Sequence, residues 1–215
     1  MAATMVRIDP RTGALFGFAA VAAWVVLYLV AAVSSPGYTI TGNRLSDLGN
    51  PSRPADWAFN SACILAGLFF LPFASGLGAG MRPWMRLVGS VLLSLAAVFL
   101  ILLGIFHEES PYDLHFIFSA LFFILFMMAI SHYAVGMWRN PRYGKISGLL
   151  SVVASGLALL FIVAVVVEAV GGVPIAGGVV SNVLEHVTVF AGLAWAGWNA
   201  WRLSRIGTGP GTAES

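Results

Sequence analysis

Six long apolar segments constrain this chain more than any other feature of its sequence. They run over about residues 13–34, 57–80, 87–107, 113–138, 146–169 and 178–201. A helix needs about 20 mostly apolar residues to cross a bilayer, and each segment is long enough. The pattern therefore predicts an all-α, polytopic integral membrane protein with six transmembrane helices.

The composition excludes several other classes of protein. Only 9% of the 215 residues are charged and 59% are hydrophobic, whereas about 25% of a soluble domain is charged. Too few polar side chains remain to cover a water-facing surface, which excludes an ordinary soluble enzyme or a disordered chain. The net charge is only +2 and the basic residues are scattered, so we expect no nucleic-acid partner.

No soluble domain fits between the apolar segments. We therefore expect one six-helix domain over residues 1–205, followed by a disordered tail over 206–215. The first apolar run is longer than the roughly 7–15 residues of a signal-peptide core, so it should remain as an anchor.

Basic residues predict the orientation of the helices. Nine of them fall on one side of the membrane, against Arg44 and Arg53 on the other. The nine are Arg7, Arg11, Arg82, Arg86, Arg139, Arg142, Lys145, Arg202 and Arg205. By the positive-inside rule, we expect a multi-pass protein of the cell membrane with both termini in the cytoplasm.

Acidic residues and histidines concentrate on the opposite, outer side. That side holds seven of the nine acidic residues and three of the four histidines. Ionisable groups are costly inside a membrane, so their positions indicate function. The distribution predicts a polar cavity in the outer half of the membrane that faces the extracytoplasmic side.

Glu185 is the most informative of these residues. It lies about seven residues into the sixth segment, roughly 10 Å below the outer end of that helix. A carboxylate at that depth must be paired, protonated, metal-bound or in contact with a wet cavity. Asn182 and His186 share an arc of roughly 140° with it on the same helix.

Two other stretches should face the same cavity. One is the loop NRLSDLGNP, in which Asn43 is expected to cap a turn and Asp47 either pairs with Arg44 or contributes to a site. The other is the fourth segment, where Ser119 follows His115 by one turn. Glu108 and Glu109, in the preceding hairpin, are expected to face water. The predicted ligand-binding residues are Arg44, Asp47, Ser119, Asn182 and Glu185.

These motifs resemble a known family. NRLSDLGNP after the first segment, Asn60 and Gly67 in the second, GIFHEESPYDLHFIFSALFF across the third and fourth, and Glu185 in the sixth are similar to the bacterial and archaeal membrane family called domain of unknown function 998. The resemblance covers nearly the whole chain and implies architecture rather than activity. It favours Ser46, Asp47, His115 and Glu185 as family positions, whereas His107 and His186 depart from the family pattern.

A looser analogy links the chain to the alkaline ceramidase and adiponectin receptor superfamily of seven-helix hydrolases. Those proteins hold zinc with three histidines and have an Asp and a Ser nearby. The analogy implies Ser46 and Asp47 as catalytic residues here. It implies His107, His115, His186 and Glu185 as candidate metal ligands.

Three functions remain open at this stage. The first, which assumes least, is a protein that binds or carries a membrane lipid or another small amphiphile in the polar cavity. The second is a zinc-dependent intramembrane lipid hydrolase, in which zinc activates a water molecule. The third is a protein with one outer haem between His115 and His186. Whether the chain is an enzyme stays open, and a hydrolase is expected if it is one.

Overall fold

The computed structural model describes residues 8–206. Six long helices form: α1 (Pro10–Val33), α2 (Asp56–Gly76), α3 (Pro83–Ile105), α4 (Leu114–Trp138), α5 (Gly144–Gly171) and α6 (Val179–Ser204). Three short 3-10 helices join them: η1 (Ser46–Gly49), η2 (Pro111–Asp113) and η3 (Ile175–Gly178). Each of the six long helices lies in a segment long and apolar enough to cross a membrane, so the all-α, multi-pass prediction is confirmed.

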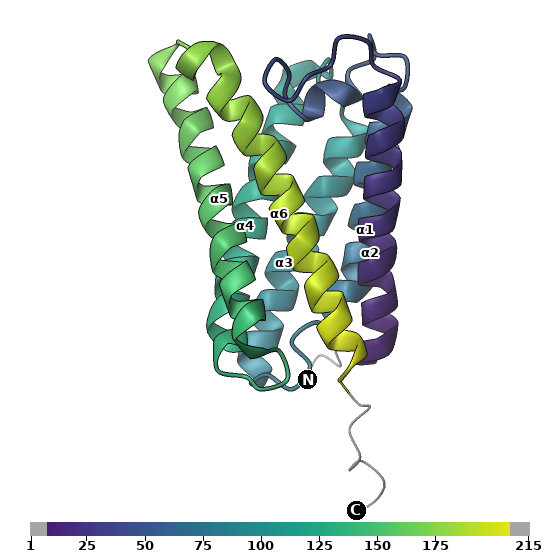
Figure 1. Cartoon of the computed structure of the whole chain (residues 1–215), viewed down its shortest axis with the longest axis vertical. Coiled ribbons are helices and arrows are strands. Elements are labelled where there is room, and N and C mark those ends of the chain that lie inside the picture. Colours follow the sequence, from purple (N-terminus) through teal and green to yellow (C-terminus); the bar gives the residue numbers. More distant parts are fainter. Residues whose placement is uncertain (1–7, 207–215) are drawn as a thin grey trace, which may run out of the picture.

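The helices form a closed ring in which each packs against the next and α6 returns to α1. Figure 1 shows α6 crossing the bundle diagonally, from the end of α5 to the opposite end of α1. Residues 34–55, 106–113 and 172–178 lie at one end, which we call the loop end. Residues 77–82 and 139–143 lie at the other, which we call the basic end.

The largest departure from the predicted boundaries is between α2 and α3. The second helix ends at Gly76 rather than residue 80, and the third begins at Pro83 rather than residue 87. Gly78 and Gly80 adopt positive φ angles of 85° and 79°, which end a helix, and proline is favoured at a first helical position. Arg7 and residues 207–215 of the predicted tail lie outside the described residues.

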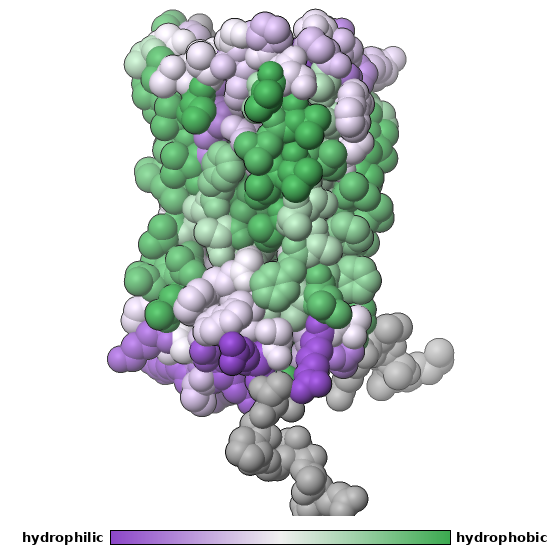
Figure 2. Space-filling view, turned by 45° about the vertical axis from the view of Figure 1, so that its right-hand side comes forward, coloured by the Kyte–Doolittle hydropathy of each residue, from purple (hydrophilic) through white to green (hydrophobic). Residues whose placement is uncertain are grey.

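The outer surface of the bundle is apolar around its middle. Figure 2 shows a hydrophobic band between a strongly hydrophilic basic end and a more weakly hydrophilic loop end. Large apolar side chains such as Val26, Val152 and Leu160 are more than half exposed there. In water such a surface would be unstable, and in a bilayer it faces lipid.

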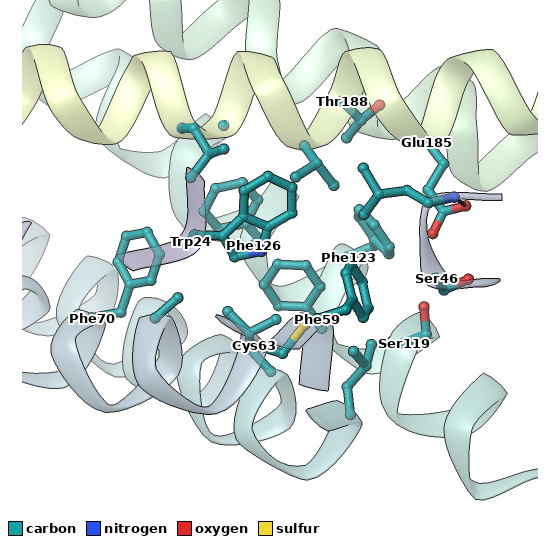
Figure 3. Close-up of a pocket in the computed structure, with 18 residues that line it drawn as sticks. Trp24, Ser46, Phe59, Cys63, Phe70, Ser119, Phe123, Phe126, Glu185 and Thr188 are labelled. Atoms are coloured by element: carbon teal, nitrogen blue, oxygen red, sulfur yellow. Dashed lines mark hydrogen bonds between the residues drawn. The ribbon is translucent and has the colours of Figure 1, made fainter. Parts of the chain in front are cut away.

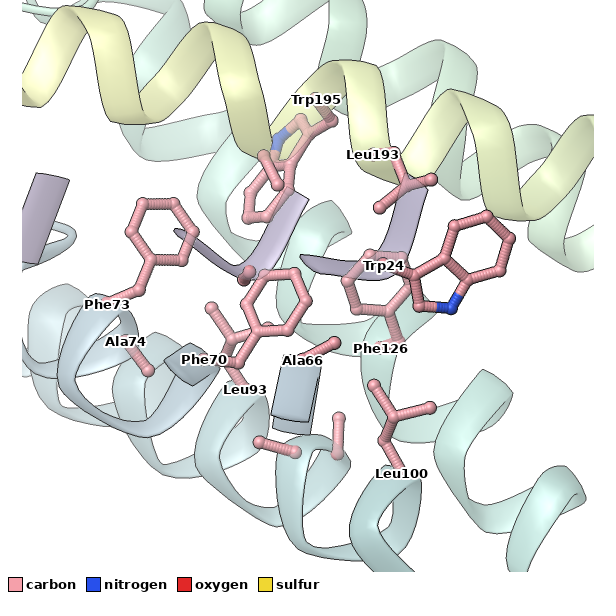
Figure 4. Packing of buried hydrophobic residues seen from close by; sticks show 14 of the residues in the cluster. Trp24, Ala66, Phe70, Phe73, Ala74, Leu93, Leu100, Phe126, Leu193 and Trp195 are labelled. Atoms are coloured by element: carbon pink, nitrogen blue, oxygen red, sulfur yellow. The ribbon is translucent and has the colours of Figure 1, made fainter. Parts of the chain in front are cut away.

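Aromatic side chains fill the interior of the ring. Figure 4 shows Trp24 of α1, Phe70 and Phe73 of α2, Phe126 of α4 and Trp195 of α6 converging on the axis. Trp195 is fully buried, and its indole Nε1 donates a hydrogen bond of 2.8 Å to Ser151 Oγ on α5. This polar bond between helices satisfies a donor that lipid could not.

Candidate functional site

The segment between α1 and α2 folds back onto the loop end of the bundle. Its turn η1 places Leu45 and Leu48 in the core, with 3% and 0% of their surface exposed. Asn60 of α2 donates its Nδ2–H to the carbonyl of Gly49 at 3.1 Å. A Cβ at Gly49 would lie 2.5 Å from Asn60 Oδ1, so only glycine permits this approach. Two residues that carry the family resemblance, Gly49 and Asn60, thus fix the loop.

Two adjacent residues of this loop hold two carboxylates from distant parts of the chain. The backbone N–H of Leu45 donates to Oε2 of Glu185 at 3.1 Å, and Ser46 Oγ donates to Oε1 of Glu108 at 3.2 Å. Asn50 Nδ2 donates to the second oxygen of Glu108 at 3.4 Å. Glu185 retains only 4% of its surface exposed.

The expectation that Glu108 faces water is met only in part, because the side chain is half-buried and lines the vestibule. Glu108 is pulled onto the loop by Ser46 and Asn50, while the neighbouring Glu109 is exposed as expected. Burial raises the pKa of the Glu108 carboxyl, and the nearby Asp47 raises it further. The hydrogen bonds from Asn50 and Ser46 act in the opposite direction.

Arg44 and Asp47 do not form a side-chain ion pair. Asp47 Oδ2 accepts from the backbone N–H of Arg44 at 3.1 Å and from Asn43 Nδ2 at 3.2 Å. Asn43 thus binds the Asp47 side chain rather than capping the turn. The Arg44 guanidinium instead lies 3.8 Å from a carboxylate oxygen of Glu168 at the end of α5. Glu168 also accepts the backbone N–H of Ile175 at 3.0 Å, which ties α5 to η3.

His186 is engaged through both ring nitrogens. Nδ1 lies 2.7 Å from the Asn182 carbonyl, which can only accept, so Nδ1 donates and Nε2 accepts from the Tyr38 hydroxyl. Burial raises the pKa of Tyr38, as do Tyr28 and Glu185, so the phenol keeps its proton. Asn182 donates its side-chain Nδ2–H to the Thr41 carbonyl at 3.0 Å, which anchors the same loop.

His107 and His115 lie at the junction of α3 and α4. His115 Nδ1 donates to the carbonyl of Phe106 at 3.0 Å. Its Nε2 is buried with no hydrogen-bond partner among residues 8–206, and the same holds for Nδ1 of His107.

The predicted metal ligands do not fit a metal centre. Among residues 8–206, no group of three or more His, Cys, Asp or Glu side chains is arranged to hold an ion. His186 would have to break its bond with Tyr38 before it could ligate zinc or haem. The geometry therefore gives the zinc and haem hypotheses no support from His107, His115, His186 and Glu185.

Three cavities meet at the cluster of polar residues. The first, which we call the lateral groove, has a volume of about 330 Å³ and lies between α4 and α5. Its polar lining residues are Arg44, Ser46, Glu108, Asp113, His115, Ser119 and Glu185. Its remaining walls are mostly apolar: Phe116, Ala120, Phe123, Ile124, Phe161, Ile162, Val165 and Val166. Phe116, Ile124 and Val166 also belong to the exposed apolar surface, so the groove reaches the lipid-facing side.

The second, which we call the inner cavity, continues into the ring and holds about 50 Å³. Figure 3 shows the oxygens of Ser46, Ser119 and Glu185 at one end of it and aromatic rings toward the other. These three residues and Phe123 line both the lateral groove and the inner cavity. A ligand in the groove and a ligand in the inner cavity would therefore contact the same three polar side chains.

The third, which we call the polar vestibule, has a volume of about 590 Å³ and lies above the groove at the loop end. Arg44 and Glu108 line both the vestibule and the groove, while Asp47, Glu168 and Asn182 line the vestibule alone. The predicted ligand-binding residues thus all line at least one of the three connected spaces. Three further lining carboxylates, Glu108, Asp113 and Glu168, are not among the predicted ligand-binding residues. Glu108 was not singled out because a Glu after a helix is typical of a solvated loop.

The fold and this site define a class of protein: a six-helix membrane bundle with an amphipathic groove at one end. A family model described as "Protein of unknown function (DUF998)" matches residues 18–202. The chain belongs to this family, as its motifs indicated. Neither a curated protein nor a solved structure matched the chain.

Proposed function

We propose that this protein binds or carries a membrane lipid or another small amphiphile in the lateral groove. The observation that carries the proposal is the division of that groove into a polar end and apolar walls. Glu108, His115 and Glu185 line one end, and Phe161 and Val165 are among the side chains that line the rest. A molecule with a polar head and a hydrocarbon tail matches both parts, and a volume of about 330 Å³ lies within the range of small-molecule sites.

The position of the groove supports an amphiphile over a water-soluble ligand. Its exposed walls belong to the apolar surface that faces lipid, while its polar end joins the vestibule at the loop end. An amphiphile in the adjacent leaflet could thus enter sideways without leaving the bilayer. The basic residues at the opposite end support an extracytoplasmic position for this groove, by the positive-inside rule.

The proposal is tested by filling the groove from one wall. Val165→Trp would place an indole in the groove, whereas Val167→Trp, on the exposed side of the same helix, is the matched control. Lipids that co-purify with the detergent-solubilised chain are identified and quantified by mass spectrometry. We expect Val165→Trp to lose most of the bound amphiphile and Val167→Trp to retain it. Equal retention by both folded variants, or no bound or bindable amphiphile in the unsubstituted protein, would overturn the proposal.

A further inference from the structure

Carboxylates outnumber cations in the polar lining of the lateral groove, where Glu108, Asp113 and Glu185 stand against Arg44. Glu185 uses one carboxylate oxygen for the N–H of Leu45, and its other oxygen has no hydrogen-bond donor among residues 8–206. Glu185 is nearly fully buried, yet it lines both the groove and the inner cavity. This second oxygen remains accessible from the cavity, so a ligand that donates a hydrogen bond there would satisfy it.

His115 also lines the groove but offers it no hydrogen-bond donor. Its Nδ1 carries the proton because it donates to the Phe106 carbonyl, which leaves Nε2 of the neutral ring as an acceptor. Nε2 is buried and has no partner within the described part of the chain. The ring therefore presents no N–H to a ligand in the groove, and Nε2 itself is too deeply buried for such a ligand to contact.

The charges at the polar end have the same preference. Glu108 and Glu185 both line the groove, and no Lys, Arg or His nitrogen of residues 8–206 lies within 4.0 Å of either carboxylate. Arg44, the basic residue of the groove, is directed to Glu168 instead. A carboxylate without a paired cation is expensive in a low-dielectric site, and this cost is largest for the buried Glu185.

We infer that the amphiphile carries a primary ammonium group, which lies between Glu108 and Glu185 while its hydrocarbon tail follows the apolar wall. This inference rests on the proposed function and names the chemistry of its ligand. An ammonium group offers three donors, no acceptor and one positive charge. It therefore complements the free oxygen of Glu185 and the unpaired charge of Glu108. A long-chain amine and an aminophospholipid share this chemistry.

The experiment compares head groups at a constant chain length. The full chain in a non-ionic detergent is titrated with dodecylamine, 1-dodecanol and dodecyltrimethylammonium, and binding is measured from the rise in unfolding temperature. Lauroyl lysophosphatidylethanolamine forms a fourth arm that separates an aminophospholipid from a simple amine. We expect dodecylamine or the lysolipid to bind at least about tenfold more tightly than 1-dodecanol, because charge-assisted hydrogen bonds are stronger than neutral ones.

Matched variants assign the effect to the groove. Glu185→Gln and Glu108→Gln remove one charge each, and Glu109→Gln removes the same charge from an exposed neighbour that lines none of the three cavities. We expect the first two to weaken binding of the preferred amine about tenfold and the third to leave it unchanged. If Glu185→Gln does not fold, Glu108→Gln carries the comparison.

The outcomes separate this inference from the proposed function. Binding of 1-dodecanol as tight as that of both amines, or equal losses in Glu108→Gln and Glu109→Gln, overturns the ammonium head group but leaves amphiphile binding intact. Binding of dodecyltrimethylammonium as tight as that of dodecylamine overturns the requirement for N–H donors on the ligand. Absence of binding in all four arms, together with absence of any co-purified amphiphile, overturns both.

Discussion

The backbone N–H of Leu45 donates to the carboxylate of Glu185 at 3.1 Å, across 140 positions of sequence. This bond joins the first loop to the last helix, and it positions the carboxylate at the meeting point of the groove and the inner cavity. Leu45 is itself almost fully buried, so its N–H depends on this acceptor within the protein.

The first prediction concerns the acceptor at position 185. Glu185→Ala leaves the Leu45 N–H buried without a partner and should lower the free energy of unfolding by about 1–3 kcal/mol. Glu185→Gln keeps an amide oxygen as acceptor and should lose much less. Denaturant unfolding in detergent measures both. Equal losses in the two variants would show that the hydrogen bond to Leu45 does not hold the loop.

The second prediction concerns the close approach of Gly49 to α2. Gly49→Ala places a Cβ 2.5 Å from Asn60 Oδ1 and 2.9 Å from a ring carbon of Phe59. We expect a loss of about 1–3 kcal/mol from this overpacking. Because Asn60→Ala removes one of the two obstacles, the double variant should be less destabilised than the sum of the single ones.

Gly156→Ala is the control for this substitution, because a Cβ there would meet no atom within 4 Å. Alanine is also the better helix former, so this variant should be at least as stable as the unsubstituted protein. Thermal unfolding measures the whole series. Strict additivity of Gly49→Ala and Asn60→Ala would contradict the proposed steric coupling.

The third prediction is a pH dependence that originates at Glu108. Its pKa is raised above the ordinary value of 4.5 by burial and by Asp47. Between the ordinary pKa of the unfolded state and the raised pKa of the folded state, the folded state binds more protons than the unfolded state. The free energy of unfolding therefore falls as the pH rises through that window. Above the pKa of the folded state, Glu108 is deprotonated in both states, so the loss of stability is complete and no longer changes with pH.

Glu108→Gln removes this titration. The stability of the unsubstituted protein relative to Glu108→Gln should therefore decline as the pH rises from about 4.5 and then level off. Unfolding temperatures of both proteins over this pH range provide the measurement. The unfolding temperature of Glu109→Gln, a change in the exposed neighbour, should vary with pH in the same way as that of the unsubstituted protein. A relative stability that increases with pH would show that Glu108 is held as a favoured carboxylate instead.

The helical framework could be predicted because length and hydropathy alone specify a membrane helix. The predicted boundaries failed mainly between α2 and α3, where the apolar run continues past Gly76 although the chain turns at Gly78 and Gly80. Hydropathy does not distinguish an apolar turn from an apolar helix. The boundaries are set instead by the positive φ angles of Gly78 and Gly80 and by Pro83 at the start of α3.

Part of the site was also predictable, because the depth of Glu185 in its helix indicated a polar cavity without any knowledge of its partners. Glu108 was not predictable in the same way. Its burial depends on Ser46 and Asn50, which lie 62 and 58 positions earlier in the chain. The pairing of Tyr38 with His186 spans 148 positions. The sequence indicated which end of the bundle is polar, but the hydrogen-bond partners there depend on how the loop between α1 and α2 folds.

The last prediction concerns metal dependence. His186 donates through Nδ1 to Asn182 and accepts through Nε2 from Tyr38, so neither nitrogen is available to an ion. No other group of ligating side chains among residues 8–206 is arranged for one. Elemental mass spectrometry of the purified protein should therefore find less than one zinc per chain, and a chelator should leave the unfolding temperature unchanged. His115→Ala should have no effect on the metal content. A content of about one zinc per chain that is lost in His115→Ala would contradict this prediction. Such a result would mean that His115 and His186 adopt an arrangement different from the one described, and it would restore the zinc hydrolase as a candidate.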